Sequence, residues 1–156
     1  MNVITTANGV PGATRRRGFV AARAASVAGL AVVVVASFGP WLRSGERVRS
    51  SYDLVKVVDR IEVLDGGALR WLSTVWVCVP LLAAIALACF VGGAPRWAAT
   101  VGAAVGACAL LAGWAVLDAP LRAEWGTRVA VVGGALVLIS GAAVIATATS
   151  QERNPL

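Results

Sequence analysis

The sequence predicts an all-α membrane protein, with four transmembrane helices in a bundle and a short amphipathic helix in the first outer loop. Hydrophobic side chains make up 58% of the 156 residues and charged side chains only 14%, whereas a soluble domain carries about 25% charge. The apolar residues form four runs, each close to the roughly 20 residues that a helix needs to cross a bilayer. Half of the charged residues lie between the first two runs, in residues 40–70.

The four predicted spans cover approximately residues 20–42, 71–93, 97–117 and 128–150. They make one transmembrane domain over residues 18–150, with outer loops at 43–70 and 118–127. Residues 1–17 are predicted to be a disordered basic tail and 151–156 a C-terminal tail. We expect a kink in the second span, because Pro80 has no amide hydrogen to donate to the carbonyl of Trp76.

The start of the first span carries the topology signal. Arg15, Arg16, Arg17 and Arg23 stand there without an acidic residue, and basic residues beside a first span indicate its cytoplasmic flank. We therefore expect a multi-pass protein of the plasma (inner) membrane with both termini in the cytoplasm.

The same region also has features of a secretory signal. Arg16-Arg17-Gly18-Phe19-Val20 resembles part of the twin-arginine pattern, and Val34-Val35-Ala36 fits a cleavage site for small residues. The apolar run continues past that site through Pro40-Trp41-Leu42. We therefore favour an uncleaved first span over a cleaved signal.

The first outer loop contains signals for a short helix. Ser50-Ser51-Tyr52-Asp53 predicts a capping box at its start, and Asp65-Gly66-Gly67 predicts its end. The alternative is a strand, because valine favours extended structure. The apolar residues between the two signals follow helical spacing: Leu54, Val57, Val58, Ile61 and Leu64.

The sequence lacks the residues that several classes of enzyme and metalloprotein need. Histidine is absent, which excludes histidine-ligated zinc or haem and nucleophiles activated by histidine. Cys78, Cys89 and Cys108 lie in predicted spans without a CxxC motif, so we expect no disulfide framework. No span contains an acidic residue that could carry a proton at depth. We therefore expect a protein that is not an enzyme and has no cofactor and no metal site.

Small and aromatic residues in the spans predict packing and anchoring. Gly102 and Gly106 are four positions apart, a spacing that lets two helices approach closely. Trp97 marks the inner interface, and the other tryptophans fall towards the outer one: Trp41, Trp71, Trp76, Trp114 and Trp125. Interface anchoring accounts for most of them. For Trp76 and Trp114, about one turn inside the spans, the alternative is packing between helices.

The stretch Gly39-Pro40-Trp41-Leu42-Arg43-Ser44-Gly45, followed by Arg49-Ser50-Ser51-Tyr52-Asp53-Leu54, resembles uncharacterised small four-span membrane proteins of actinobacteria. The composition, rich in alanine, valine and arginine, fits a GC-rich genome of that kind. The resemblance covers the start of the outer loop and the four-span layout. It implies a setting in the cell envelope and no particular activity.

The first functional hypothesis is a non-catalytic accessory or scaffold subunit that presents residues 43–70 and 118–127 to a cell-envelope partner. The alternative is a small carrier or lipid-handling protein with a cleft between spans near Pro80 and Trp114. An enzyme using loop carboxylates has the least support. We expect contacts with the lipid bilayer and with a membrane-protein partner or a second copy of the chain, and none with nucleic acid. The candidate partner surface consists of Trp41, Arg43, Arg49, Tyr52, Asp53, Lys56, Asp59 and Arg60.

Overall fold

The structure is a computed structural model of the chain and describes residues 11–44, 46–60, 74–118 and 122–152. Its helices are α1 (Pro11–Phe38), α2 (Ser51–Arg60), α4 (Val79–Val91), α5 (Pro95–Leu117) and α6 (Trp125–Glu152). Its strands are β1 (Pro40–Ser44), β2 (Arg47–Ser50) and β3 (Arg122–Ala123). The strands form one antiparallel sheet in the order β2-β1-β3.

Within the described residues, three helices are long and apolar enough to cross a membrane. The stretches concerned are Arg16–Phe38, Pro95–Leu117 and Trp125–Thr149, and α4 is a shorter apolar helix of 13 residues. The prediction of a helical protein with membrane-spanning helices is therefore confirmed for α1, α5 and α6.

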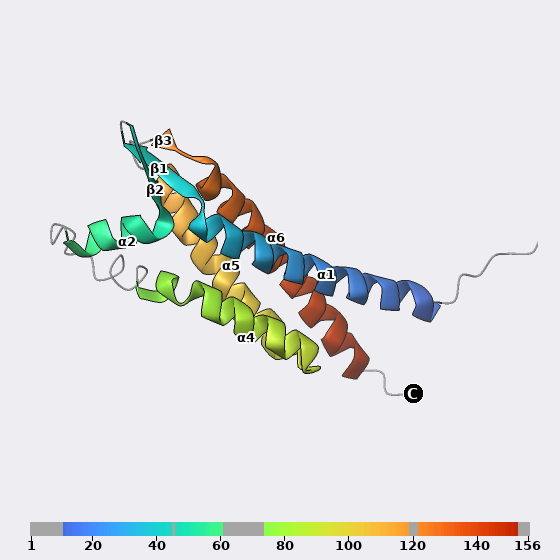
Figure 1. Cartoon of the computed structure of the whole chain (residues 1–156). Helices are drawn as coiled ribbons and strands as arrows, with labels where there is room; N and C mark the ends of the chain where they lie inside the picture. Colours follow the sequence, from blue (N-terminus) through green and yellow to red (C-terminus); the bar gives the residue numbers. More distant parts are fainter. Residues whose placement is uncertain (1–10, 45, 61–73, 119–121, 153–156) are drawn as a thin grey trace, which may run out of the picture.

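The long helices lie side by side, with α6 packed against both α1 and α5 and with α4 packed against α5 (Figure 1). The sheet and α2 lie together at one end, which we call the cap end. The other end, where α1 begins and α6 finishes, is called the open end. A tight turn over residues 92–94 joins α4 to α5, and Gly93 adopts a φ of 78° there. Glycine suits this position because it has no Cβ to oppose a positive φ.

Glycine permits the closest helix contacts, between α5 and α6. A Cβ on Gly106 would lie 2.8 Å from the carbonyl oxygen of Gly134, and a Cβ on Gly134 would lie 2.8 Å from the carbonyl oxygen of Gly106. Gly102 is also buried, but its Cβ would meet nothing nearer than a Val137 methyl at 3.5 Å. Helices in lipid gain stability from such close van der Waals contact, since burial of apolar surface gives little net gain there.

Polar contacts add to the packing of α1. The hydroxyl of Ser26 donates a hydrogen bond to that of Ser140 on α6 at 2.8 Å, and both residues are buried. At the open end, a guanidinium nitrogen of Arg23 donates to the carbonyl oxygen of Phe90 at 2.5 Å. The Arg23 guanidinium also lies 5.8 Å from the Phe19 ring centre and 5.6 Å from that of Phe90. This cation therefore interacts favourably with the carbonyl end of α4 and with two aromatic faces.

The first span ends earlier than predicted. Helix α1 stops at Phe38, and Pro40-Trp41-Leu42 is the start of strand β1, so the predicted continuation of the span to residue 42 is wrong. Proline disfavours helical geometry in the residue before it, which here is Gly39. At the other end, α1 already includes residues 11–17, which were predicted to be disordered. Residues 1–10 lie outside the described part.

The other boundaries also shift. Helix α6 begins at Trp125, three residues before the predicted start, and the predicted loop at 118–127 contains strand β3. In the second predicted span, the helix is interrupted at Cys78 and α4 starts at Val79, with Pro80 in its first turn. The sequence predicts a kink from Pro80, and the structure has a break in the helix two residues before it. Residues 71–73 and 61–70 lie outside the described part, and they include the predicted end of the loop helix at Asp65.

Exposed tryptophans mark both ends of α5. Trp97 is 70% exposed and Trp114 is 74% exposed. Their positions are 17 residues apart, which is about 26 Å along a helix, close to the ~30 Å hydrocarbon thickness of a bilayer. This separation suits two interface anchors. The alternative that Trp114 packs between helices is wrong, whereas Trp76 is only 3% exposed and does pack inside the bundle.

Candidate functional site: the cap end

Trp41 fastens strand β1 to the bundle. Its side chain is 2% exposed, and its indole Nε1 donates a hydrogen bond to the carbonyl oxygen of Ala36 at 2.7 Å. Carbonyls in the last turn of a helix lack partners within the helix, and this one in α1 accepts from both the Trp41 indole and the Gly39 amide, the latter at 3.1 Å. Its ring meets Trp76 edge to face, with centroids 4.9 Å apart and planes at 68°, an arrangement worth about 0.5–1.5 kcal/mol beyond burial.

A β-bulge explains how two consecutive residues of β1 are buried. The pairing with β2 shifts between Pro40, which faces Ser50, and Leu42, which faces Arg49. Trp41 is the extra residue, and both it and Leu42 are buried. Successive side chains of a regular strand point to opposite faces, but a bulge re-aims one of them. The bulge thus lets both apolar side chains reach the core.

The start of α6 and the residue before it pack against β1 and donate hydrogen bonds to it. The backbone amide of Glu124 and the hydroxyl of Thr127 both donate to the carbonyl oxygen of Trp41, each at 2.9 Å. A Cβ on Gly126 would lie 2.5 Å from the carbonyl oxygen of Pro40, so only glycine allows this approach. Arg43 and Glu124 add an ion pair at 3.8 Å, which contributes little because both groups reach solvent.

Helix α2 is fastened to the end of α1. The buried Ser51 hydroxyl donates to the carbonyl oxygen of Ser37. The Tyr52 hydroxyl lies 3.3 Å from the Ser37 hydroxyl, and its ring centre lies 5.2 Å from that of Phe38. These contacts fix the direction in which α2 leaves the sheet.

The start of α2 carries the capping box that the sequence predicts. The Asp53 carboxylate accepts hydrogen bonds from the Ser50 hydroxyl at 2.9 Å and from the Ser50 amide at 3.3 Å, while the Asp53 amide donates to the Ser50 hydroxyl at 3.3 Å. The hydrogen bond from the Ser50 side chain has the largest effect on the pKa of the Asp53 carboxyl, and the bond from the Ser50 amide adds to it. Together they hold this pKa below its ordinary value of 3.8. Nearby Lys56 and Arg49 lower this pKa further.

Basic side chains surround this capping box on the outside of the cap. A shallow groove of about 460 Å³ is lined by Arg47, Val48, Arg49, Asp53 and Lys56, and we call it the basic groove. Arg47, Val48, Asp53 and Lys56 are exposed, and Arg49 is half-buried. Three cations against one carboxylate make the groove suitable for an acidic ligand.

The predicted partner surface is only partly assembled. Arg49, Asp53 and Lys56 come together in the basic groove, while Arg43 lies beside Glu124 and Tyr52 packs on Phe38. The assignment of Trp41 to the surface is wrong, because its side chain is buried in the core against Trp76. Asp59 and Arg60 belong to α2, but their side chains lie outside the described part.

Sequence reasoning missed Arg47 and Val48 as members of the groove and missed the sheet altogether. The alternation Arg47-Val48-Arg49-Ser50 was a signal for a strand, because side chains on one face of a strand recur every two residues. Sequence reasoning also missed Ser37 and Thr127, because their hydrogen-bond partners lie on other elements.

The described residues contain no group of three or more histidine, cysteine, aspartate or glutamate side chains that could hold a metal ion. In comparisons with protein-family models, curated proteins and solved structures, none matched this chain. Its function has to be inferred from its own residues.

Proposed function

We propose that this protein is a non-catalytic accessory or scaffold subunit of the cell membrane, whose basic groove binds an acidic segment of a cell-envelope partner. The observation that carries the proposal is the contrast between the buried attachments of the cap and its exposed basic face. A surface held in place before binding loses less entropy when a partner arrives.

The charge of the groove selects the partner's chemistry. Arg47, Arg49 and Lys56 outnumber Asp53, and the Asp53 carboxylate is already hydrogen-bonded to Ser50. Arginine binds carboxylates with two parallel hydrogen bonds. An acidic peptide segment therefore suits the groove better than a basic or an apolar one.

The proposed topology has four spans, with the cap outside and both termini in the cytoplasm. Helical residues 74–77 and α4 together reach from 74 to 91, about 27 Å at 1.5 Å per residue, close to the ~30 Å hydrocarbon core. The arginines at the start of α1 favour the cytoplasmic side for the open end.

Cysteine labelling tests this topology. In a variant lacking Cys78, Cys89 and Cys108, an impermeant thiol reagent applied to intact cells should label Val48→Cys. It should label Gly92→Cys only after the cells are opened. Labelling of Gly92→Cys in intact cells would contradict a crossing by α4.

A photo-crosslinking amino acid tests the partner. Placed at Val48, it should give one discrete protein adduct in intact cells, whereas at Ile139, an exposed position on the apolar surface of α6, it should give none of that adduct. Arg47→Glu together with Arg49→Glu should remove the Val48 adduct. The same adducts from Val48 and Ile139, or no adduct at Val48, would refute the proposal.

The second candidate is the carrier or lipid-handling protein. Its supporting observation is Trp76, whose buried Nε1 has no hydrogen-bond acceptor among the described residues. A bound molecule with an acceptor oxygen could supply one. A stoichiometric lipid in the purified protein, lost in Trp76→Phe, would favour this candidate.

A further inference from the structure

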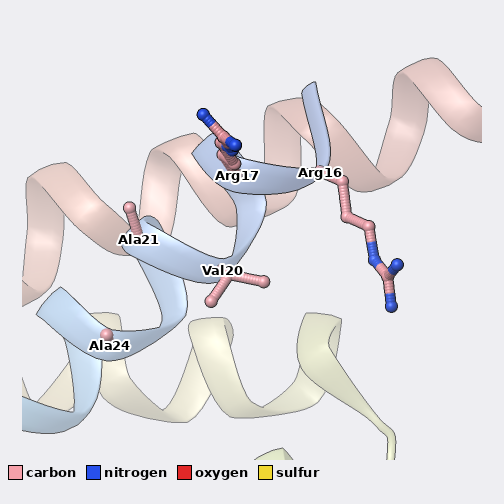
Figure 2. A pocket seen from close by; sticks show the side chains of 5 residues that line it. All are labelled: Arg16, Arg17, Val20, Ala21 and Ala24. Atoms are coloured by element: carbon pink, nitrogen blue, oxygen red, sulfur yellow. The ribbon is translucent and has the colours of Figure 1, made fainter. Parts of the chain in front are cut away.

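A second groove follows the start of α1 at the open end of the bundle. It has a volume of about 620 Å³ and is lined by Arg16, Arg17, Val20, Ala21 and Ala24 (Figure 2). The two arginines come first along the helix, and the three apolar residues follow on the next turns. The groove therefore changes from cationic to apolar along the helix axis.

Both arginines are available to a ligand. Their side chains are exposed, and neither has a hydrogen-bond or ion-pair partner in the part of the chain that the structure describes. Helix α1 has no acidic residue that could neutralise them. Arg23 differs, because its guanidinium is already bonded to the carbonyl oxygen of Phe90.

The depth of the groove matches the boundary between lipid headgroups and acyl chains. Arg23 contacts Phe90 just before the turn that ends α4, and the exposed Trp97 lies just after that turn. Arg16 lies seven positions before Arg23, about 10 Å further out along α1. The apolar part of the groove lies around Arg23 along the helix axis: Val20 and Ala21 come before it and Ala24 comes after it. All three apolar residues are exposed.

We propose that this groove binds an anionic phospholipid of the bilayer. The phosphate lies on Arg16 and Arg17, and the start of an acyl chain lies against Val20, Ala21 and Ala24. Guanidinium groups pair with phosphate oxygens through charge-assisted hydrogen bonds. Two neighbouring cations disfavour a zwitterionic headgroup, because its ammonium group would lie close to them. This site is separate from the basic groove and does not depend on the function proposed for it.

Native mass spectrometry of the full-length protein tests the proposal. The detergent-solubilised protein receives equal amounts of phosphatidylglycerol and phosphatidylcholine with identical chains. We expect preferential retention of phosphatidylglycerol. Arg16→Gln together with Arg17→Gln should reduce this preference roughly 25-fold, at about fivefold for each cation. Arg16→Lys with Arg17→Lys should keep most of it.

A steric variant tests the apolar part of the groove. Ala24→Leu fills the groove without a change of charge and should reduce retention of phosphatidylglycerol, whereas Ala31→Leu, at an exposed position on α1 outside the groove, should not. Unchanged thermal unfolding of each variant verifies its fold. Equal retention of the two lipids by the unmodified protein would overturn the proposal. So would a glutamine variant that keeps the preference, or displacement of the lipid by millimolar inorganic phosphate.

Discussion

The two ends of the bundle are held together in different ways. At the cap end, strand β1 packs against the ends of apolar helices. Thr127 and Glu124 donate to the Trp41 carbonyl in the strand, and the Trp41 indole donates to the Ala36 carbonyl in α1. At the open end the helices stay regular, and one charged side chain, Arg23, ties α1 to α4. Irregular backbone near membrane depth survives only where neighbouring groups supply its hydrogen bonds. Among the described residues, the cap end is therefore held by hydrogen bonds between a strand and helices, whereas at the open end a cation binds the end of a neighbouring helix.

The strongest test of this contrast is removal of the buried ring at the cap end. Trp41→Ala should lower the free energy of unfolding by about 3–5 kcal/mol, as for other large aromatic residues in cores. Trp114→Ala, at an exposed position, should have a much smaller effect. Denaturant unfolding in detergent measures both. Equal losses would mean that Trp41 does not anchor the cap.

The next effect lies in the helix contacts between the two ends. Gly106→Ala should destabilise the protein by about 2 kcal/mol, because the new methyl group meets a backbone carbonyl that cannot move aside easily. Gly102→Ala is the matched control, since its methyl group would be in ordinary contact at 3.5 Å. The same detergent assay compares them. A Gly102→Ala variant as unstable as Gly106→Ala would contradict the packing described for α5 and α6.

At the open end, Arg23→Gln should cost about 1.5 kcal/mol, because it removes one hydrogen bond from a charged donor. Arg17→Gln deletes the same charge nearby without breaking a contact between described residues, and it should leave stability unchanged in lipid-free detergent. Thermal unfolding distinguishes the two. If both variants behave alike, Arg23 does not hold α1 to α4.

The smallest effect concerns pH at the capping box. The pKa of Asp53 is lowered in the folded protein, so its contribution to stability is present above the ordinary value of 3.8 and is lost as the pH falls through the lower folded pKa. The start of α2 should thus be intact at pH 7 and fray only in acid. An NMR titration of the Asp53 carboxyl should give a pKa below 3.8, and Ser50→Ala should raise it. No change in Ser50→Ala would exclude the capping bonds as the cause.

Local features were predictable from sequence alone. The apolar runs predicted α1, α5 and α6 as helices able to cross a membrane, because their length and composition leave few alternatives in lipid. The capping box at Ser50 and Asp53 and the interruption near Pro80 were also predictable. The capping box and the interruption each depend on residues within four positions of one another, so they can be predicted without knowledge of distant partners.

Tertiary structure alone decided how the cap is built and which residues it exposes. Trp41 lies one residue before the end of the predicted span and is predicted to be an interface anchor. Its side chain is buried instead, and its carbonyl accepts a hydrogen bond from Thr127, 86 positions later in the chain. The pairing of Leu42 with Ala123, and the bulge that buries Trp41 beside Leu42, depend on the same approach of α6. A short strand is stable only when a partner satisfies its backbone. Hydrophobic periodicity within one segment carries no information about a partner so far away in sequence.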